Sequence, residues 1–416
     1  MQELATLPLP RTIERTQSAS EGLLAPGKAA LTVGLGLVVT MAAFEALAIA
    51  TVLPEAQRDL GGLGLYGLIF VAYMVASLGG ILLAGREADR RGLTAPLAAG
   101  LTVFAAGLLL GGLAPTMVVL IAARGVQGIG AGAIITVAYA AIARGYDESQ
   151  RPRMFAVLSS AWVVPGLIGP SLAGAVAEYA SWRLVFLGIL PLVVIGGAFT
   201  LPSLRRMGPP LGTTSRGGLR TLLRETPRIV PAVVVFALLT MTFFGAEAYL
   251  PLTLSEVRGQ SATVAGLALS AGTLSWTAGS WLQARTAQTV DRRLLVAVGL
   301  ALVGAGIGLL IPLAMGAPIW IAPLSWAVSG LGIGMGYPSM SLVILGSAPA
   351  GREGAASAAI NTSSVVGSAA GTGIGAVVVA LGASGAWSTE TSVILVFATM
   401  IGFVALAVIM TRRLGQ

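Results

Sequence analysis

The chain has 416 residues, of which 56% are hydrophobic and only 10% are charged, and its net charge is +8. A soluble protein of this length would carry about 25% charged residues, so this composition excludes a water-facing surface and indicates a protein that lies in lipid. The chain contains no His and no Cys, which excludes disulfides and thiolate metal sites and leaves proton transfer to carboxylates, tyrosines and arginine-coupled carboxylates.

Apolar runs long enough to cross a bilayer as helices, about 20 residues each, recur along the whole chain. We expect twelve spans, at roughly residues 29–53, 66–84, 94–114, 116–143, 154–178, 184–202, 229–254, 262–282, 294–314, 318–346, 356–382 and 389–411. The pattern predicts an all-α integral membrane protein.

The basic residues predict how these spans are oriented, because cytoplasmic loops carry an excess of Lys and Arg. With the N-terminus in the cytoplasm, 21 basic residues fall in cytoplasmic segments and 3 in outer loops, while Arg124 lies inside a span. Both termini are therefore expected in the cytoplasm of a multi-pass cell-membrane protein. The positive charge follows from this topology, and we expect no nucleic-acid partner.

The longest predicted cytoplasmic connection holds six Arg and divides the spans into six and six. The halves resemble each other, since "TMAAFEALA" in the first span has a counterpart in "TMTFFGAEAYLP" in the seventh. Duplications of this kind build two pseudo-symmetric bundles with a substrate site between them, as a rocking transporter requires. The predicted parts are a tail (1–28), a six-helix bundle (29–202), a linker (203–228), a second six-helix bundle (229–411) and a short tail (412–416).

Glu45 is the only ionisable residue between Lys28 and Glu55. It lies about 24 Å along its helix from the inner end, at 1.5 Å per residue. A carboxylate in this place can bind a proton in one access state and release it in the other, as a proton-driven transporter requires. Glu247, in the seventh span, is a second candidate. For each residue the alternative is a hydrogen-bonded structural glutamate.

The segment "GREADRRG", from Gly85 to Gly92, joins the second and third spans. Gly85 can permit close helix approach, and Gly92 can form a turn with positive φ. Asp89 can accept hydrogen bonds at a neighbouring helix N-terminus, and Arg90 can pair with a carboxylate. Such a cluster can latch helices together in one conformation. The alternative is a charged loop that only obeys the positive-inside rule.

The segment "RGVQGIGAG" places Arg124 inside the fourth span, where a charge costs about 2.5–3.5 kcal/mol at the bilayer centre. Arg124 is expected to pair with Gln127, one turn away, or with a carboxylate such as Glu45 on the first span; the alternative is that it reaches the outer surface. Gly128 and the glycines after it allow tight helix contacts.

The segment "PGLIGPSLAG" lies in the fifth span. Pro170 removes a backbone hydrogen bond and is expected to bend the helix. Gly166, Gly169 and Gly174 give it a smooth face, which predicts a pliable packing seam with the other half. The alternative is a kinked helix with a structural role only.

These segments together resemble the major facilitator superfamily over essentially the whole chain. The residues Gly85, Asp89, Arg90 and Gly92 are similar to its loop motif between helices 2 and 3. Arg124, Gln127 and Gly128 are similar to its helix 4 motif, which the resemblance links to proton coupling. Gly169, Pro170 and Gly174 resemble the helix 5 motif of antiporters, and "WRLVFLGILP" resembles the start of helix 6 in drug:proton antiporters.

The expected substrate site is apolar and aromatic, which favours a lipophilic cargo over a sugar or a phosphate. Its candidate residues are Met41, Phe44, Glu45, Tyr73, Trp162, Phe244, Tyr249, Trp276, Tyr337 and Asn361. For each of them the alternative is packing or contact with lipid.

The leading hypothesis is a monomeric, proton-coupled exporter of lipophilic and in part cationic small molecules, with membrane lipids as its surroundings. The alternatives are an exporter of a native lipid or secondary metabolite, a membrane sensor and a membrane enzyme. The enzyme is disfavoured because no span carries a nucleophile–base pair or a metal cluster; we expect no metal and no cofactor.

Overall fold

The computed structural model describes residues 22–147, 150–208, 224, 226, 229–286, 289–347 and 353–412, and all regular structure within them is helical. The first half contains α2 (Ala29–Leu60), the short turn η1 (Leu63–Leu65), α3 (Tyr66–Arg91), α4 (Thr94–Gly112), α5 (Met117–Gly145), α6 (Arg151–Ser160), α7 (Val163–Tyr179), α8 (Trp182–Leu187) and α9 (Leu190–Arg206). The second half contains α11 (Val230–Glu247), α12 (Leu250–Leu252), the π-turn η3 (Thr253–Val257), α13 (Ala262–Thr286), α14 (Arg292–Ala314), α15 (Ile321–Ser347), α16 (Glu353–Ala383) and α17 (Thr389–Thr411).

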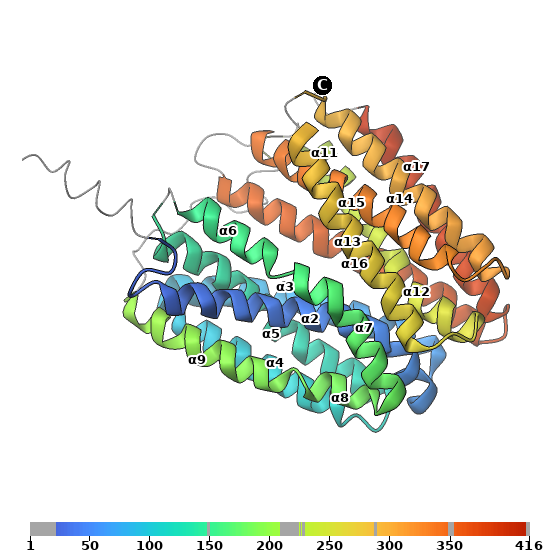
Figure 1. Cartoon of the computed structure of the whole chain (residues 1–416), viewed down its shortest axis with the longest axis horizontal. Coiled ribbons are helices and arrows are strands. Elements are labelled where there is room, and N and C mark those ends of the chain that lie inside the picture. Colours follow the sequence, from blue (N-terminus) through green and yellow to red (C-terminus); the bar gives the residue numbers. More distant parts are fainter. Residues whose placement is uncertain are drawn as a thin grey trace, which may run out of the picture.

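The helices of each half lie together, the first half blue to green and the second yellow to red in Figure 1. Each half is organised around one central helix. In the first half α5 packs against both α3 and α4, and in the second half α15 packs against both α13 and α14. The predicted tails (1–28 and 412–416) and linker (203–228) lie largely outside the described residues.

Ten of the twelve expected spans coincide with helical segments that are long and apolar enough to cross a membrane. The all-helical prediction is therefore confirmed for the described residues, while the fifth and eighth spans do not meet that criterion. The fifth is divided between α6 and α7. The eighth, α13, is a single helix of 25 residues that carries several Ser and Thr and packs on α7 of the other half.

Proline explains three helix breaks. Its nitrogen carries no hydrogen and cannot donate to the carbonyl four residues earlier. A helix ends about four residues before each of three prolines. Helix α6 ends at residue 160, before Pro165; α8 ends at residue 187, before Pro191; and α11 ends at residue 247, before Pro251. The fifth span was expected to bend at Pro170, but the structure breaks it at residues 161–162 and keeps Pro170 inside α7.

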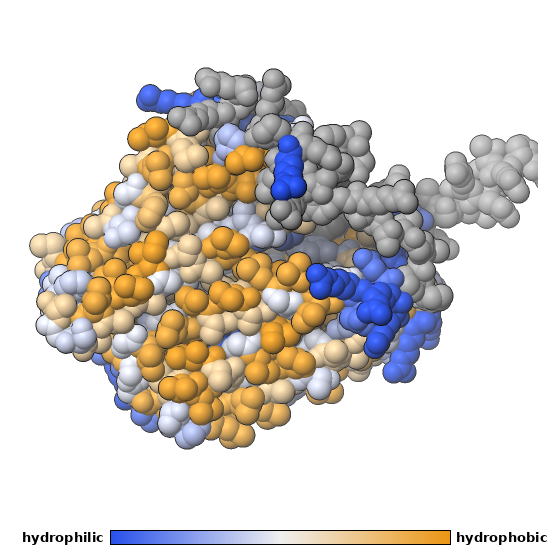
Figure 2. Space-filling model, turned by 180° about the vertical axis from the view of Figure 1, so that it is seen from behind, coloured by the Kyte–Doolittle hydropathy of each residue, from blue (hydrophilic) through white to orange (hydrophobic). Residues whose placement is uncertain are grey.

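The face of the molecule that Figure 2 shows is mostly apolar, with hydrophilic residues gathered toward its ends. Val194, Leu82 and Ile409 each expose more than 60% of their surface. An apolar surface of this extent is a membrane surface rather than a water-facing one.

The two halves pack together at the end of the bundle where α2 passes into α3, which we call the contact end. The hydroxyl of Tyr66 donates a hydrogen bond of 3.1 Å to the carbonyl of Ala248. Arg58, in the last turn of α2, forms a 2.6 Å ion pair with Glu256 and donates to the carbonyl of Ser255 at 2.7 Å. These contacts join residues nearly 200 positions apart, so they tie one half to the other.

Candidate functional site

A buried ion pair lies inside the first half. Arg124 on α5 donates from the same nitrogen, Nη1, to Oε1 of Glu45 on α2 and to Oε1 of Gln127, the second over 2.7 Å. Glu45 and Gln127 are completely buried, and Arg124 exposes 3% of its surface. Tyr73 on α3 completes the cluster, with its ring centroid 4.1 Å from Cζ of Arg124. The structure thus brings Arg124 to both of the partners suggested by the sequence, and not to the outer surface.

Glycines let the helices around this cluster approach closely. A Cβ on Gly128 of α5 would lie 3.0 Å from the carbonyl carbon of Tyr73, and its carbonyl oxygen would be closer still. A Cβ on Gly107 of α4 would lie 2.7 Å from the Cβ of Gln127. Side chains at these two positions would push α3 and α4 away from α5. Gly128, in the helix 4 motif, and Gly107, on α4 outside that motif, therefore both support the packing that holds Arg124 in place.

The cluster leaves hydrogen-bonding capacity unused. Oε2 of Glu45, Nε of Arg124 and Nε2 of Gln127 are buried and have no hydrogen-bond partner among the described residues. Removing one member of a buried pair costs about 3–5 kcal/mol, because the other charge is left uncompensated. Protonation of Oε2 would cancel the charge of Glu45 without removing the side chain, so the pair is suited to respond to a proton.

An aromatic cluster lies in the second half. Phe243 on α11 stacks on Trp326 of α15 with ring centroids 4.8 Å apart, and it meets the edge of Trp276 of α13 at 5.4 Å. Trp276 also contacts Phe244 at 6.2 Å and Tyr337 at 5.9 Å. Phe243 and Trp326 are buried, whereas Phe244, Trp276 and Tyr337 are half-buried and keep part of their surfaces accessible.

Glu247 is the last residue of α11, three and four positions after Phe244 and Phe243. Residues at these spacings lie on one face of a helix, so the carboxylate is one turn from the aromatic cluster, on the side of the contact end. Its side chain is half-buried and forms no hydrogen bond or ion pair with any described residue.

The remaining candidates for the substrate site do not come together in one place. Met41 is completely buried, and Tyr249 is buried at the contact end, where its hydroxyl donates to the carbonyl of Thr372 over 2.8 Å. Trp162 is 42% exposed at the break between α6 and α7. Asn361 is exposed and donates to a carbonyl of its own helix. Phe44 is half-buried, beside Gly169 of α7.

The segment from Gly85 to Gly92 was expected to connect two spans, but α3 continues through it as far as Arg91. It is not latched to a neighbouring helix in this structure. Asp89 and Arg90 are exposed; Arg90 lies 3.7 Å from Glu87 of its own helix, and Asp89 has no ion pair or hydrogen bond among the described residues. No atom lies within 4 Å of a Cβ built on Gly85, so the close helix approach expected there is absent in this conformation. Gly92 does have the expected positive φ, +82°.

Two glycines of the helix 5 motif, Gly166 and Gly174, face the other half, whereas Gly169 faces Phe44 of α2. A Cβ on Gly174 would lie 2.8 Å from the carbonyl carbon of Ala262, and one on Gly166 would collide with the side chain of Thr273. The hydroxyls of Ser171 and Ser270 lie 3.2 Å apart across the same surface. This surface between α7 and α13, which we call the α7–α13 seam, has the geometry expected for a packing seam between halves.

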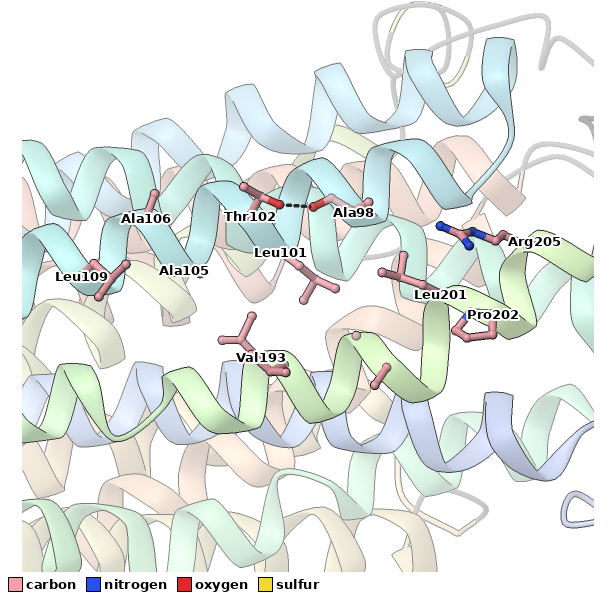
Figure 3. Close-up of a pocket in the computed structure, with 13 residues that line it drawn as sticks. Ala98, Leu101, Thr102, Ala105, Ala106, Leu109, Val193, Leu201, Pro202 and Arg205 are labelled. Carbon is pink, nitrogen blue, oxygen red and sulfur yellow. Dashed lines mark hydrogen bonds between the residues drawn. The ribbon is translucent and has the colours of Figure 1, made fainter.

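A groove of ≈ 710 Å³ opens between α4 and α9 (Figure 3). Its lining is apolar apart from Thr102 and Arg205, and it contains none of the residues predicted to bind substrate or protons. Both helices pack within the first half. The groove is therefore not the site between the halves that the duplication predicts.

Several functional contacts were not predicted from the sequence. They are the contacts of Phe236, Phe243 and Trp326 within the aromatic cluster and the ion pair between Arg58 and Glu256. The aromatic contacts can be recognised only when the registers of α11, α13 and α15 are known. The ion pair could have been suspected, because Arg58 and Glu256 end corresponding helices on the same predicted side.

Comparison with known proteins identifies the family. The model of the Major Facilitator Superfamily matches residues 34–372. A probable multidrug-efflux transporter of Mycobacterium tuberculosis is 27% identical over 408 residues, covering 83% of this chain and 86% of that protein. The multidrug efflux pump SdrM of Staphylococcus aureus is 29% identical over 163 residues, 39% of this chain but only 36% of its own length, so that match spans well under half of the relative.

Solved structures show the same fold. A bacterial homologue of the human lysosomal transporter Spinster, in an inward-facing and occupied conformation, has a TM-score of 0.70 at 15% sequence identity, covering 93% of this chain and 96% of the other. With the family match over most of the chain and the apolar helices described above, the protein is a multi-pass membrane protein that belongs to the major facilitator superfamily.

Proposed function

We propose that the protein is a proton-coupled exporter of lipophilic and in part cationic small molecules, which works as an antiporter by alternating access in the cell membrane. The observation that carries this proposal is the buried pair of Glu45 and Arg124. Two relatives of the chain are named as multidrug efflux proteins, which supports export of varied small molecules.

Proton coupling follows from what a proton does to this pair. An ionised Glu45 holds the guanidinium of Arg124 by a charge-assisted hydrogen bond, which is about twice as strong as a neutral one. When Oε2 takes up a proton, this attraction is lost and Arg124 keeps only Gln127 and the ring of Tyr73. The contact between α2 and α5 thus has two strengths, set by one proton.

Alternating access is supported by how the halves meet. If the termini are cytoplasmic, the contact end is the outer end, and the structure corresponds to a state closed to the outside. The packing there depends on glycines of the α7–α13 seam and on the exposed pair of Arg58 and Glu256. Such contacts are weak enough to break in each transport cycle.

The test is proton flux in proteoliposomes under an imposed pH gradient, after addition of tetraphenylphosphonium as a lipophilic cation or chloramphenicol as a neutral compound. We expect cargo-dependent proton movement in the parent protein and none in Glu45→Gln. Glu390→Gln, which changes an exposed carboxylate of α17, is the matched control and should behave as the parent does.

A parent protein that moves cargo without moving protons would refute the coupling. A Glu45→Gln variant with normal proton movement would refute the role of this residue. Absence of both cargo and proton movement across the panel would favour the sensor, or an exporter restricted to one native lipid or metabolite.

A further inference from the structure

We infer that the groove between α4 and α9 is a binding site for a phospholipid with an anionic headgroup, whose acyl chain lies in the groove and whose phosphate binds Arg205. The site is separate from the proton site at Glu45 and from a cargo site between the halves, so the inference goes beyond the proposed function. Three properties of the groove support it: the polarity of its lining, its length and the charge at one end.

The lining of the groove is apolar over nearly all of its length. Leu101 of α4 and Gly197 of α9 are the buried residues of its floor. Thr102 is exposed, but its hydroxyl donates to the carbonyl of Ala98 in its own helix over 2.9 Å, as the dashed line in Figure 3 shows. The lining therefore offers a ligand no free side-chain donor except the guanidinium of Arg205.

Small side chains leave room between the two helices. Five of the thirteen lining residues are Ala or Gly, namely Ala98, Ala105, Ala106, Gly197 and Ala198. A Cβ on Gly197 would already lie 3.2 Å from a methyl carbon of Leu101, so a larger residue there would narrow the groove. The volume of ≈ 710 Å³ lies within the range of about 300–1,000 Å³ that ligand sites have.

The groove is about as long as one leaflet of a bilayer is deep. Its lining extends from Val193 to Arg205 on α9 and from Ala98 to Leu109 on α4, which is about 17–18 Å at 1.5 Å per residue. Because the hydrocarbon core is about 30 Å thick, one leaflet contributes about 15 Å of it. An acyl chain that lies along the groove would therefore begin near Arg205 and end near the middle of the membrane.

Arg205 lies at the end of the groove that faces away from the contact end. It stands in the last turn of α9, and the carbonyl of Gly208, just beyond that helix, accepts a hydrogen bond from Arg144 in the last turn of α5. Tyr146, which follows α5, lies 2.8 Å from the hydroxyl of Thr32 near the start of α2. On the topology that the basic residues predict, this end is cytoplasmic, and the cytoplasmic leaflet is the one that carries anionic lipids.

The charge of Arg205 is not matched by an anion of the surrounding helices. Arg205 is exposed and forms no hydrogen bond or ion pair with any described residue, and neither α4 nor α9 contains an acidic residue. Figure 3 shows its guanidinium at the end of the groove, between the two helices. A guanidinium can donate to two phosphate oxygens at once, and basic pockets between transmembrane helices on the cytoplasmic side bind anionic headgroups.

A phospholipid fits this combination better than the other possible occupants. A free phosphate would bind Arg205 but would leave the apolar lining without a partner. A cargo molecule in transit would need access to the region between the halves, whereas both helices of the groove pack within the first half. A ligand that joins an anion to an acyl chain uses both parts of the groove.

The experiment is native mass spectrometry of the purified full-length chain after incubation in detergent with equal amounts of palmitoyl-oleoyl phosphatidylglycerol and phosphatidylcholine. We expect the parent to retain phosphatidylglycerol preferentially, and Arg205→Gln to reduce this preference about five-fold, as expected for one basic residue that binds an anionic lipid. Arg205→Lys should keep part of the preference, because it keeps the charge. Arg206→Gln is the matched control, since Arg206 is also exposed but does not line the groove, and it should behave as the parent does.

The place of the acyl chain is tested by filling the groove. Ala198→Phe adds a ring at an exposed position of the lining and should reduce the retention of both lipids. Ala99→Phe adds the same ring at an exposed position of α4 outside the lining and should not. Inorganic phosphate, which supplies the anion without an acyl chain, should not displace the lipid.

Equal retention of the two lipids by the parent, or equal losses in Arg205→Gln and Arg206→Gln, would indicate an unspecific surface and overturn the inference. Unchanged retention in Ala198→Phe would place the lipid elsewhere, and displacement by inorganic phosphate would show an anion site that does not need an acyl chain. Displacement of the lipid by chloramphenicol would make the groove a cargo site instead. Lipid retention is measured without transport, so none of these results decides whether Glu45 couples protons to export.

Discussion

Replacing Gly266 with Ala tests whether the α7–α13 seam controls the conformational equilibrium. A Cβ on Gly266 would lie 2.6 Å from the carbonyl carbon of Pro170, a backbone atom that cannot rotate away. Ordinary van der Waals contact begins at 3.4 Å, and the carbonyl oxygen of Pro170 is closer still than its carbon, so the two helices must separate by at least about 0.8 Å at this point. Overpacking of this kind costs about 1–3 kcal/mol, which corresponds to a change of about 5- to 150-fold in the ratio of closed to open contact ends.

The cost applies only where α7 and α13 touch, so Gly266→Ala should favour the state in which the contact end is open. The chain has no Cys, and two introduced cysteines can therefore be spin-labelled without side reactions. Tyr179 on α7 and Met315 at the end of α14 are 82% and 67% exposed and belong to opposite halves. Pulsed electron resonance between labels at these positions should show a larger population of long distances in the variant.

The matched control is Gly308→Ala on α14, where a new Cβ meets no atom within 4 Å. It adds the same methyl group and the same gain in helix propensity, about 1 kcal/mol, without a collision. The reasoning is refuted if both variants give the distance distribution of the parent, or if both shift it equally.

The remaining predictions use the same labelled pair or the transport assay. Glu256→Gln removes the ion pair between the halves and should shift the label distances less than Gly266→Ala does, because an exposed pair contributes at most about 1 kcal/mol. Glu55→Gln, which removes the partner of Arg58 within α2, should not shift them. Equal shifts in the two glutamine variants would contradict the assignment. Arg124→Ala removes the cation that faces the buried Glu45, so transport should respond to pH differently from the parent. Arg124→Lys should keep a reduced rate, because it keeps the charge but lacks the planar guanidinium. Identical pH profiles in all three proteins would remove Arg124 from coupling. Asp89→Asn should slow turnover without weakening cargo binding, since Asp89 is exposed and has no ion pair or hydrogen bond among the described residues. A proportional loss of affinity would exclude a latch.

The pairing of Arg124 could be anticipated from sequence because the spans offer so few polar groups. A buried guanidinium must find an acceptor, and only Glu45 and Gln127 stood within plausible reach. The spans themselves were readable for the same reason, since lipid-facing and core-facing side chains are both apolar. In these respects the composition alone left few alternatives.

The aromatic cluster could not be anticipated, because it depends on the rotation and register of three helices. Phe243 meets Trp276 and Trp326 only because Gly272 and Gly330 bring α13 and α15 into backbone contact. The sequence shows these glycines but not which carbonyl each one touches.

The helix breaks could not be predicted from the positions of the prolines alone. Pro165 and Pro170 can both be read from the sequence, yet a helix break lies four residues before Pro165 only, and Pro170 remains inside α7. A proline removes one hydrogen bond in either place, and whether the helix then ends depends on the packing around the freed carbonyl.

The last prediction concerns how a proton at Glu45 reaches the contact end. Glu45 and Arg58 lie on the same helix, 13 residues apart, which is about 20 Å along α2. The helix therefore links the proton site directly to the ion pair with Glu256, and α2 also packs on α12 and α13 of the other half. If protonation weakens the hold of Arg124 on α2, the helix should shift as a unit and change the closure of the contact end.

Glu45→Gln imitates the protonated carboxylate, so its distance distribution between labels at Tyr179 and Met315 should match that of the parent at low pH and should not change with pH. If the distances in Glu45→Gln still change with pH as they do in the parent, another group senses the proton. If they do not change with pH but match the parent at high pH, the charge of Glu45 does not set the position of α2.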